Sequence, residues 1–234
     1  MTKLIIFNFL LGILFSQSSL AQTEKDSLCL NINLKYKDQI LELNKNYISR
    51  NDTLQINILK FYLSEIEIQY NDKTTFYFQK KHHLIDVEKS ESLQILIGKK
   101  NNKIISKIKF NIGIDSLSSV SGALSEDLDL QNGMYWAWQS GYINVKIEGS
   151  STSCKTRKNG FQFHIGGYLQ PNYAMRTIEL SRNESVNQND NLNVEVDLAN
   201  FFSEIDLKET NSIMTPGKKA MQLADFSKNM FQLK

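Results

Sequence analysis

Leu28-Cys29-Leu30-Asn31-Ile32-Asn33-Leu34 alternates apolar and polar residues, and this pattern decides the fold. A period of two places one face of a strand in a core and the other in solvent, which is typical of antiparallel sheets. Further alternating segments lie at 54–58, 66–70, 105–110, 143–147 and 194–198. Turn signals rich in Asn and Asp, as at 71–72 and 189–191, separate them. Short strands without helices between them predict an all-β fold, an antiparallel β-sandwich.

The C-terminal segment departs from this pattern. After Thr215-Pro216-Gly217, apolar residues recur at helical spacing from Lys218 to Phe231, which predicts a short amphipathic helix that packs on the sandwich. Met214, just before this helix, is either a core residue or a soft metal ligand. The chain length favours a single domain over residues 22–234.

The first residues carry an export signal. Lys3 is followed by an apolar run over 4–15 and by the small-residue exit Ser19-Leu20-Ala21, the pattern of a secretory signal peptide over residues 1–21. The run is shorter than the roughly 20 residues that a membrane span needs, which makes an uncleaved anchor the weaker alternative. No second span follows, and we expect a periplasmic or secreted protein of a Gram-negative bacterium, not an integral membrane protein.

The charge pattern and the motifs argue against two functional classes. The chain carries 27 Lys and Arg against 25 Asp and Glu, with both signs interspersed, so nucleic acid is not an expected partner. It contains no nucleophile elbow, no His-Glu-x-x-His and no cluster of paired cysteines. Asp86 and Asp115 are expected to form turn or loop hydrogen bonds. We therefore do not expect an enzyme.

Two cysteines, Cys29 and Cys154, follow the export signal. An oxidising compartment permits a disulfide between them, which would stabilise the fold by about 2–4 kcal/mol. The alternative is a thiol copper ligand, but two cysteines far apart in the sequence are a weak metal signal. The sequence favours the disulfide.

The segment Gly133-Met-Tyr-Trp-Ala-Trp-Gln-Ser-Gly-Tyr142 contains both tryptophans of the chain. On a strand, Met134, Trp136 and Trp138 would share one face. Such a stripe is either a large aromatic core cluster, with the glycines allowing bends, or a surface that binds a ligand or partner through its rings.

The chain has three histidines. His82 and His83 are adjacent, so on a strand they point to opposite faces. Alternation places His164 on the face opposite Phe163 and Ile165. If those two residues lie in the core, His164 is exposed, either as a surface imidazole or as part of a site.

Several blocks, in this order, resemble the MbnP-like family, periplasmic proteins related to copper-binding partners of methanobactin systems and to copper-repressible surface proteins of methanotrophs. The blocks are Phe61-Tyr-Leu-Ser64, His83-Leu-Ile-Asp86, Phe110-Asn-Ile-Gly-Ile-Asp115, the tryptophan segment 133–142 and Phe163-His-Ile-Gly-Gly167. The tryptophan segment is the most specific of them.

The resemblance implies a site and partners. In the characterised relatives a dihaem enzyme oxidises a tryptophan to kynurenine, and the modified side chain and histidines bind copper. Carried over, Trp136 or Trp138 would be modified, with Trp136 preferred. His164 and His83 match family histidines, and with Met134 they would suit Cu(I). A copper carrier or outer-membrane transporter is a further implied partner.

The chain departs from the family at one place. The copper-binding branch has an Asn-His pair after the Phe-x-x-Gly block, whereas this chain has Ser116-Leu-Ser-Ser-Val120. One expected ligand is absent, and two hypotheses remain. One is an exported protein that sequesters or transfers copper; the other is a non-metal binding module that uses Trp136 and Trp138.

Overall fold

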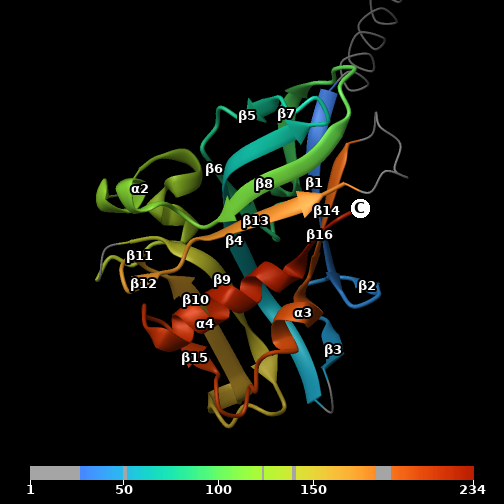
Figure 1. Ribbon diagram of the computed structural model, residues 1–234. Helices are drawn as coiled ribbons and strands as arrows, with labels where there is room; N and C mark the ends of the chain where they lie inside the picture. Colours follow the sequence, from blue (N-terminus) through green and yellow to red (C-terminus); the bar gives the residue numbers. More distant parts are fainter. Residues whose placement is uncertain (1–26, 50–51, 123, 139–140, 183–190) are drawn as a thin grey trace, which may run out of the picture.

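The computed structural model describes residues 27–49, 52–122, 124–138, 141–182 and 191–234. The predicted signal peptide and the segment 189–190 lie outside these residues. Two sheets pack face to face (Figure 1), which confirms the all-β sandwich. The smaller sheet contains β1 (Ser27–Tyr36), β2 (Gln39–Ile40), β7 (Gln94–Lys99), β14 (Leu192–Asp197) and β16 (Phe231–Leu233). None of the described helices is long and apolar enough to cross a membrane.

The larger sheet is organised by one long strand, β4 (Asp52–Tyr70). It also contains β3 (Asn46–Ser49), β5 (Thr75–Tyr77), β6 (His82–Asp86), β8 (Ile105–Ile112), β9 (Ile143–Ser151), β10 (Gly160–Gly166), β13 (Arg176–Ser181) and β15 (Ser212–Ile213). Along one edge, β4 pairs first with β9, up to Phe61, and then with β8, from Leu63. The sheet therefore forks at Tyr62, and the candidate site lies at this fork.

The alternation of β1 is confirmed, because its buried residues include Leu28, Leu30, Ile32 and Leu34. Strand direction is less regular than expected. β1 pairs with β14 in parallel, and β10 pairs with β15 in parallel. The other described pairs of the two large sheets are antiparallel. Alternation reports which face is buried and carries no information on strand direction.

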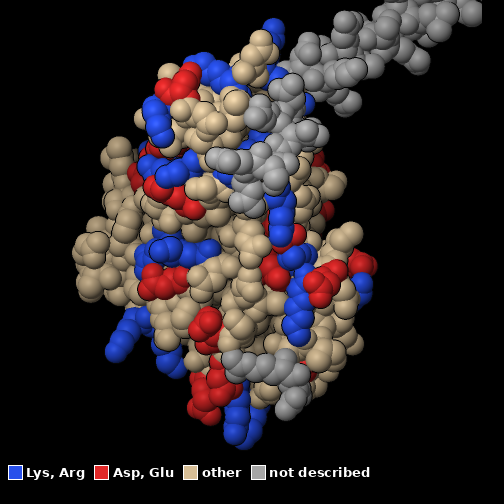
Figure 2. Space-filling model, turned by 45° about the vertical axis from the view of Figure 1, so that its right-hand side comes forward, with Lys and Arg blue, Asp and Glu red and all other residues tan. Residues whose placement is uncertain are grey.

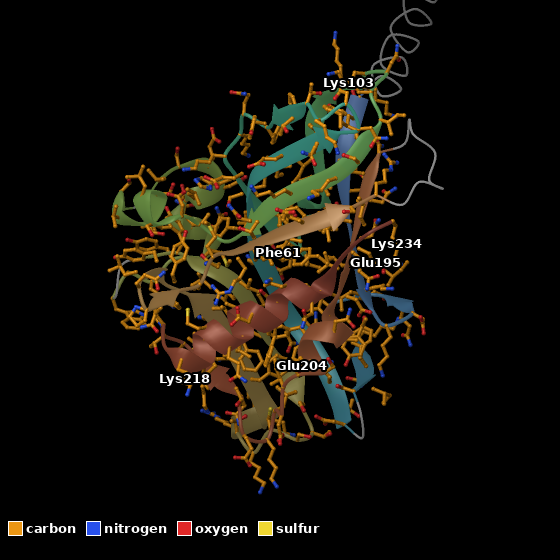
Figure 3. The ribbon with its side chains drawn as sticks, viewed as in Figure 1. Phe61, Lys103, Glu195, Glu204, Lys218 and Lys234 are labelled. Carbon is orange, nitrogen blue, oxygen red and sulfur yellow. The ribbon has the colours of Figure 1, made fainter. Side chains whose placement is uncertain are left out.

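The main core lies between the two sheets. Phe61 of β4 lies in the middle of the molecule (Figure 3) and is fully buried. Its ring contacts Phe231 of β16, with centroids 5.9 Å apart. Two helices, α3 (Leu198–Phe202) and α4 (Lys218–Ser227), cover the rest of the inner face over β10. Their contacts include Phe163 against Phe201.

The predicted C-terminal helix is confirmed but shorter than expected. α4 ends at Ser227 and continues as a 3-10 turn, η5 (Lys228–Met230). Phe231 belongs to strand β16, where it pairs with Val196. Met230 in this turn and Phe231 in the edge strand are both buried, so apolar residues at helical spacing continue past the end of the helix.

Short elements complete the chain. They are α2 (Ser116–Val120), η1 (Ser90–Leu93), η2 (Glu126–Leu128), η3 (Leu130–Asn132), η4 (Arg157–Asn159) and the small hairpin of β11 (Tyr168–Leu169) and β12 (Asn172–Tyr173). On the face shown in Figure 2, Lys and Arg side chains intermingle with Asp and Glu.

Candidate functional site

The tryptophan segment forms a tight turn rather than the predicted strand. Tyr135 and Tyr142 form an isolated antiparallel bridge, and the Trp136 amide donates to the Gly141 carbonyl at 2.9 Å. Gly141 has a φ of 136°, which favours glycine and lets the chain reverse. Gln139 and Ser140 lie outside the described residues. The prediction of a continuous strand is wrong here because the chain turns after Trp136.

This turn separates the two tryptophans. Met134 is fully buried and Trp136 is 5% exposed, as alternation expects, whereas Trp138 is 65% exposed. The two rings still contact each other, with centroids 6.2 Å apart. The predicted stripe of three residues on one face is therefore a buried pair plus a surface ring.

Met134 and Trp136 belong to a second core on the outer face of the large sheet. Its other buried members are Tyr62, Leu84, Ile114, Leu128, Tyr142 and Ile143. Two buried phenols tie the covering loops to the sheet, because Tyr142 donates to the Leu128 carbonyl at 2.9 Å and Tyr62 to that of Asp127 at 3.0 Å. Burial raises the pKa of both phenols, so they remain protonated donors.

His164 lies on the same outer face. It pairs with Lys146 of β9, and its Nε2 lies 2.7 Å from Glu148 Oε1. This hydrogen bond lowers the pKa of Glu148, against the effect of burial. The predicted face is correct, but the expected exposure is not, since His164 is 7% exposed.

Gly166 brings Trp136 next to the strand of His164. A Cβ built on Gly166 would lie 2.8 Å from two carbons of the Trp136 ring and 2.6 Å from the Tyr142 carbonyl oxygen. Only glycine leaves room for the indole at this position. Residues two apart share a face, so the Trp136 ring packs on the face of β10 that carries His164.

His83 lies on the other face of this sheet. It pairs with Leu63, a main-core residue, while His164 and Lys146 align with Lys60 on the outer face. The predicted site of His164, His83 and Met134 does not form, because the sheet separates the two imidazoles. Among the described residues, no three His, Cys, Asp or Glu side chains are grouped to hold a metal ion.

His82, and not His83, faces the second core. Its Nε2 lies 3.1 Å from Ser118 Oγ, and Ser118 also bonds Asp115, which caps α2. Burial opposes ionisation of Asp115, but hydrogen bonds from Ser118 and Lys81 lower its pKa to about 2. The carboxylate bonds the hydroxyl rather than the imidazole, so the group is a helix cap and not a nucleophile triad.

The predicted disulfide is not present. Cys29 and Cys154 are both free thiols. Cys29 lies on β1 of the smaller sheet, opposite Leu96. Cys154 is buried after β9, where its Sγ lies 3.5 Å from the Leu207 carbonyl oxygen, and burial raises its pKa. Cys29 therefore lies in the smaller sheet, and Cys154 lies in the turn after a strand of the larger sheet. The distance between two cysteines, which decides whether they can form a disulfide, comes from tertiary packing and not from the sequence pattern.

Tyr62, Trp136 and the other buried residues of the second core lie around the fork of the larger sheet. The sequence profile of MbnP matches residues 25–215. The chain belongs to the MbnP family. MbnP from Methylosinus trichosporium has a similar fold, with a TM-score of 0.60 and 13% identity over 82% of each chain. No curated protein sequence matches the chain. The resemblance drawn from the sequence blocks is confirmed at the level of family and fold.

A small pocket adjoins Trp136. It has a volume of about 240 Å³ and is lined by Trp136, the segment 167–170, Asn172 and Pro216. The indole nitrogen of Trp136 is buried and has no hydrogen-bond partner among the described residues. Leu169 at the pocket wall is largely exposed. This MbnP-family chain thus has a buried indole that packs on the strand of His164 and lines a surface pocket.

Proposed function

We propose that the chain is an exported copper-handling protein whose centre consists of His164, Glu148 and an oxidised Trp136. Membership of the MbnP family supports a copper-related role in a methanobactin-type system. One observation carries the choice of residues: the Trp136 ring packs on Gly166, two positions after His164 on the same face of β10.

The unmodified side chains are too few for a preformed copper site. His164 and Glu148 supply one imidazole and one carboxylate, already bonded to each other. Met134 is sealed in the second core, and no third acidic, cysteine or histidine ligand joins them among the described residues. Kynurenine at position 136 would add an aromatic amine and a ketone near His164 as further donors. Because these donors arise only when Trp136 is oxidised, we expect copper binding by the modified protein and not by the unmodified one.

The oxidation would need an external enzyme, and the family resemblance implies a dihaem one. With two molecules of hydrogen peroxide as the four-electron oxidant, the indole C2–C3 bond breaks, each of the two carbons gains one oxygen atom to give N-formylkynurenine, and the two peroxides are reduced to two waters. Hydrolysis then releases the formyl carbon as formate and leaves kynurenine. Trp138 is the alternative target, because its ring is exposed and touches that of Trp136.

Mass spectrometry and copper titration test this proposal together. Protein from the native host should carry the tryptophan-to-kynurenine mass change, located by peptide mapping at Trp136. Modified protein should bind copper, and His164→Ala and Trp136→Phe should lose this binding. His83→Ala is the matched control, because His83 lies on the opposite face and should leave binding unchanged. Unmodified native protein without copper affinity, or full binding by His164→Ala, would rule the proposal out.

A second candidate function is binding of a non-metal ligand at the pocket beside Trp136. It is favoured by the unpartnered indole nitrogen and by the exposed Trp138 and Leu169, which suit a ligand with an acceptor and an apolar body. This function needs no oxidation. Unmodified protein would then show ligand-dependent tryptophan fluorescence that Leu169→Ala weakens and His164→Ala does not.

A further inference from the structure

A second pocket, larger than the one beside Trp136, lies at the edge of the larger sheet and away from Trp136. It has a volume of about 550 Å³ and lies between β6, η1, β7 and η2, with Phe78, His83 and Leu96 among its lining residues. β6 pairs with β4 alone among the described strands, so its other edge is open to this pocket. The volume falls within the range of small-molecule sites, about 300–1,000 Å³.

His83 lines this pocket and has one ring nitrogen that is not used in hydrogen bonding by the described residues. The residue is 8% exposed, and its ring stacks on Phe78 with centroids 5.1 Å apart. The imidazole is hydrogen-bonded to the Lys80 backbone, whereas Nε2 is buried and has no hydrogen-bond partner in the part of the chain that the structure describes. A bond to the backbone through Nδ1–H leaves Nε2 with a free lone pair. Burial lowers the pKa of His83 to about 4, so the ring is neutral at physiological pH.

The charges around the pocket favour a cation. Its walls carry the carboxylates of Asp86, Glu91, Glu126 and Asp127 and the ammonium groups of Lys80 and Lys89. Asp86 pairs with Lys60 at 2.9 Å and Lys80 pairs with Asp127 at 2.8 Å. Neither Glu91 nor Glu126 forms an ion pair with any residue that the structure describes. The four carboxylates of the pocket therefore outnumber the ammonium groups, which are three when Lys60 is counted with Lys80 and Lys89.

We propose that this pocket binds a small organic ammonium ion with an apolar body. The ammonium group donates an N–H to His83 Nε2 and is attracted by the carboxylates, and the apolar body packs against Phe78 and Leu96. A buried acceptor without a partner costs free energy, and an N–H donor removes that cost. This site lies apart from Trp136 and His164, so it does not rest on the copper proposal.

The test uses 2-phenylethylamine as a probe, with binding followed by calorimetry and by imidazole ¹⁵N spectra of the three histidines. The amine should bind and shift the His83 Nε2 signal. Its trimethylammonium analogue, which lacks the N–H donor, and the neutral 2-phenylethanol should each bind about tenfold more weakly or worse. The anionic 3-phenylpropionate should not bind.

His83→Phe is the matched variant, because it keeps the ring stacked on Phe78 and removes Nε2. It should weaken amine binding about tenfold or more, and Glu126→Gln should weaken it less. Trp136→Phe should bind the amine as the wild type does. If His83→Phe does not fold, the ¹⁵N shift and Glu126→Gln decide the question in its place. Equal binding of 3-phenylpropionate, or amine binding without a His83 shift, would overturn the proposal.

Discussion

The main core and the second core contain similar side chains but are held by different kinds of backbone. In the main core, strands of two sheets fix each residue's face by parity, as for Phe61 and Leu63 on β4. In the second core, Trp136 and Met134 come from a turn, and short helices cover them. There, side-chain hydrogen bonds such as those of Tyr142 supplement a short backbone bridge between Tyr135 and Tyr142.

This difference assigns different tasks to the two regions. A sheet ladder leaves few ways to rearrange, so the main core sets the global stability. The covering segment, described over residues 114–122, 124–138 and 141–142, is held to the sheet by side-chain bonds such as those of Tyr142 and Tyr62. It carries the exposed Trp138, and its Trp136 lines a pocket formed mainly by residues 167–172 and Pro216. We therefore expect substitutions in the main core to change the free energy of unfolding, and those in the second core to change mainly local structure and binding.

The largest expected effect is that of Phe61→Ala in the main core. Removing this fully buried ring leaves a cavity and should lower the free energy of unfolding by about 3–5 kcal/mol, as measured by urea denaturation. Trp138→Ala, at a 65% exposed position, should change it by no more than about 0.5 kcal/mol. Similar losses in the two variants would remove the distinction between the regions.

The next effect is a pH dependence that comes from His83 on the main-core side of the sheet. Its pKa is lowered from 6.5 to about 4 by burial. Below pH 6.5 the unfolded chain takes up a proton that the folded chain does not, so stability falls as the pH drops towards 4. The loss can reach about 3 kcal/mol. His83→Phe should lack this loss between pH 7 and pH 4, and the two proteins should keep a constant difference above pH 7. If the free energies of unfolding of the wild type and of His83→Phe change in parallel from pH 7 to pH 4, the pH dependence does not come from His83.

Gly166→Ala should disturb the second core by a smaller amount. Its new Cβ would meet the Trp136 ring and the Tyr142 carbonyl, and overpacking of this kind costs about 1–3 kcal/mol. The expected signature is a red-shifted tryptophan emission as Trp136 becomes exposed, together with loss of any copper binding. Gly98→Ala is the control, because nothing lies within 4 Å of its new Cβ. An unchanged emission would show that Trp136 does not depend on Gly166.

The same comparison explains what the sequence could predict. Parity along strands correctly gave the faces of Leu30, Phe163 and His164, because this information is local. Whether His83 and His164 share a face depends on the register of strand pairing, since His83 aligns with Leu63 of β4 and His164 aligns through β9 with Lys60. This register arises from tertiary pairing and is not visible in the local alternation. Trp138 was misplaced because a turn follows Trp136. The free thiols of Cys29 and Cys154 likewise depend on the packing of separate strands.

The smallest expected effect tests how the covering segment is held. Tyr142→Phe removes the hydroxyl that donates to Leu128 and accepts from the Leu124 amide at 3.2 Å, which should cost about 1–2 kcal/mol. Tyr62→Phe removes a single bond, to Asp127, and should cost less. Because these bonds anchor loops and not the ladder, amide exchange should rise first in η2 and α2, while β4 and β9 stay protected. If exchange rises equally in β4, the second core is part of the global folding unit, and its side-chain bonds contribute to the whole sandwich.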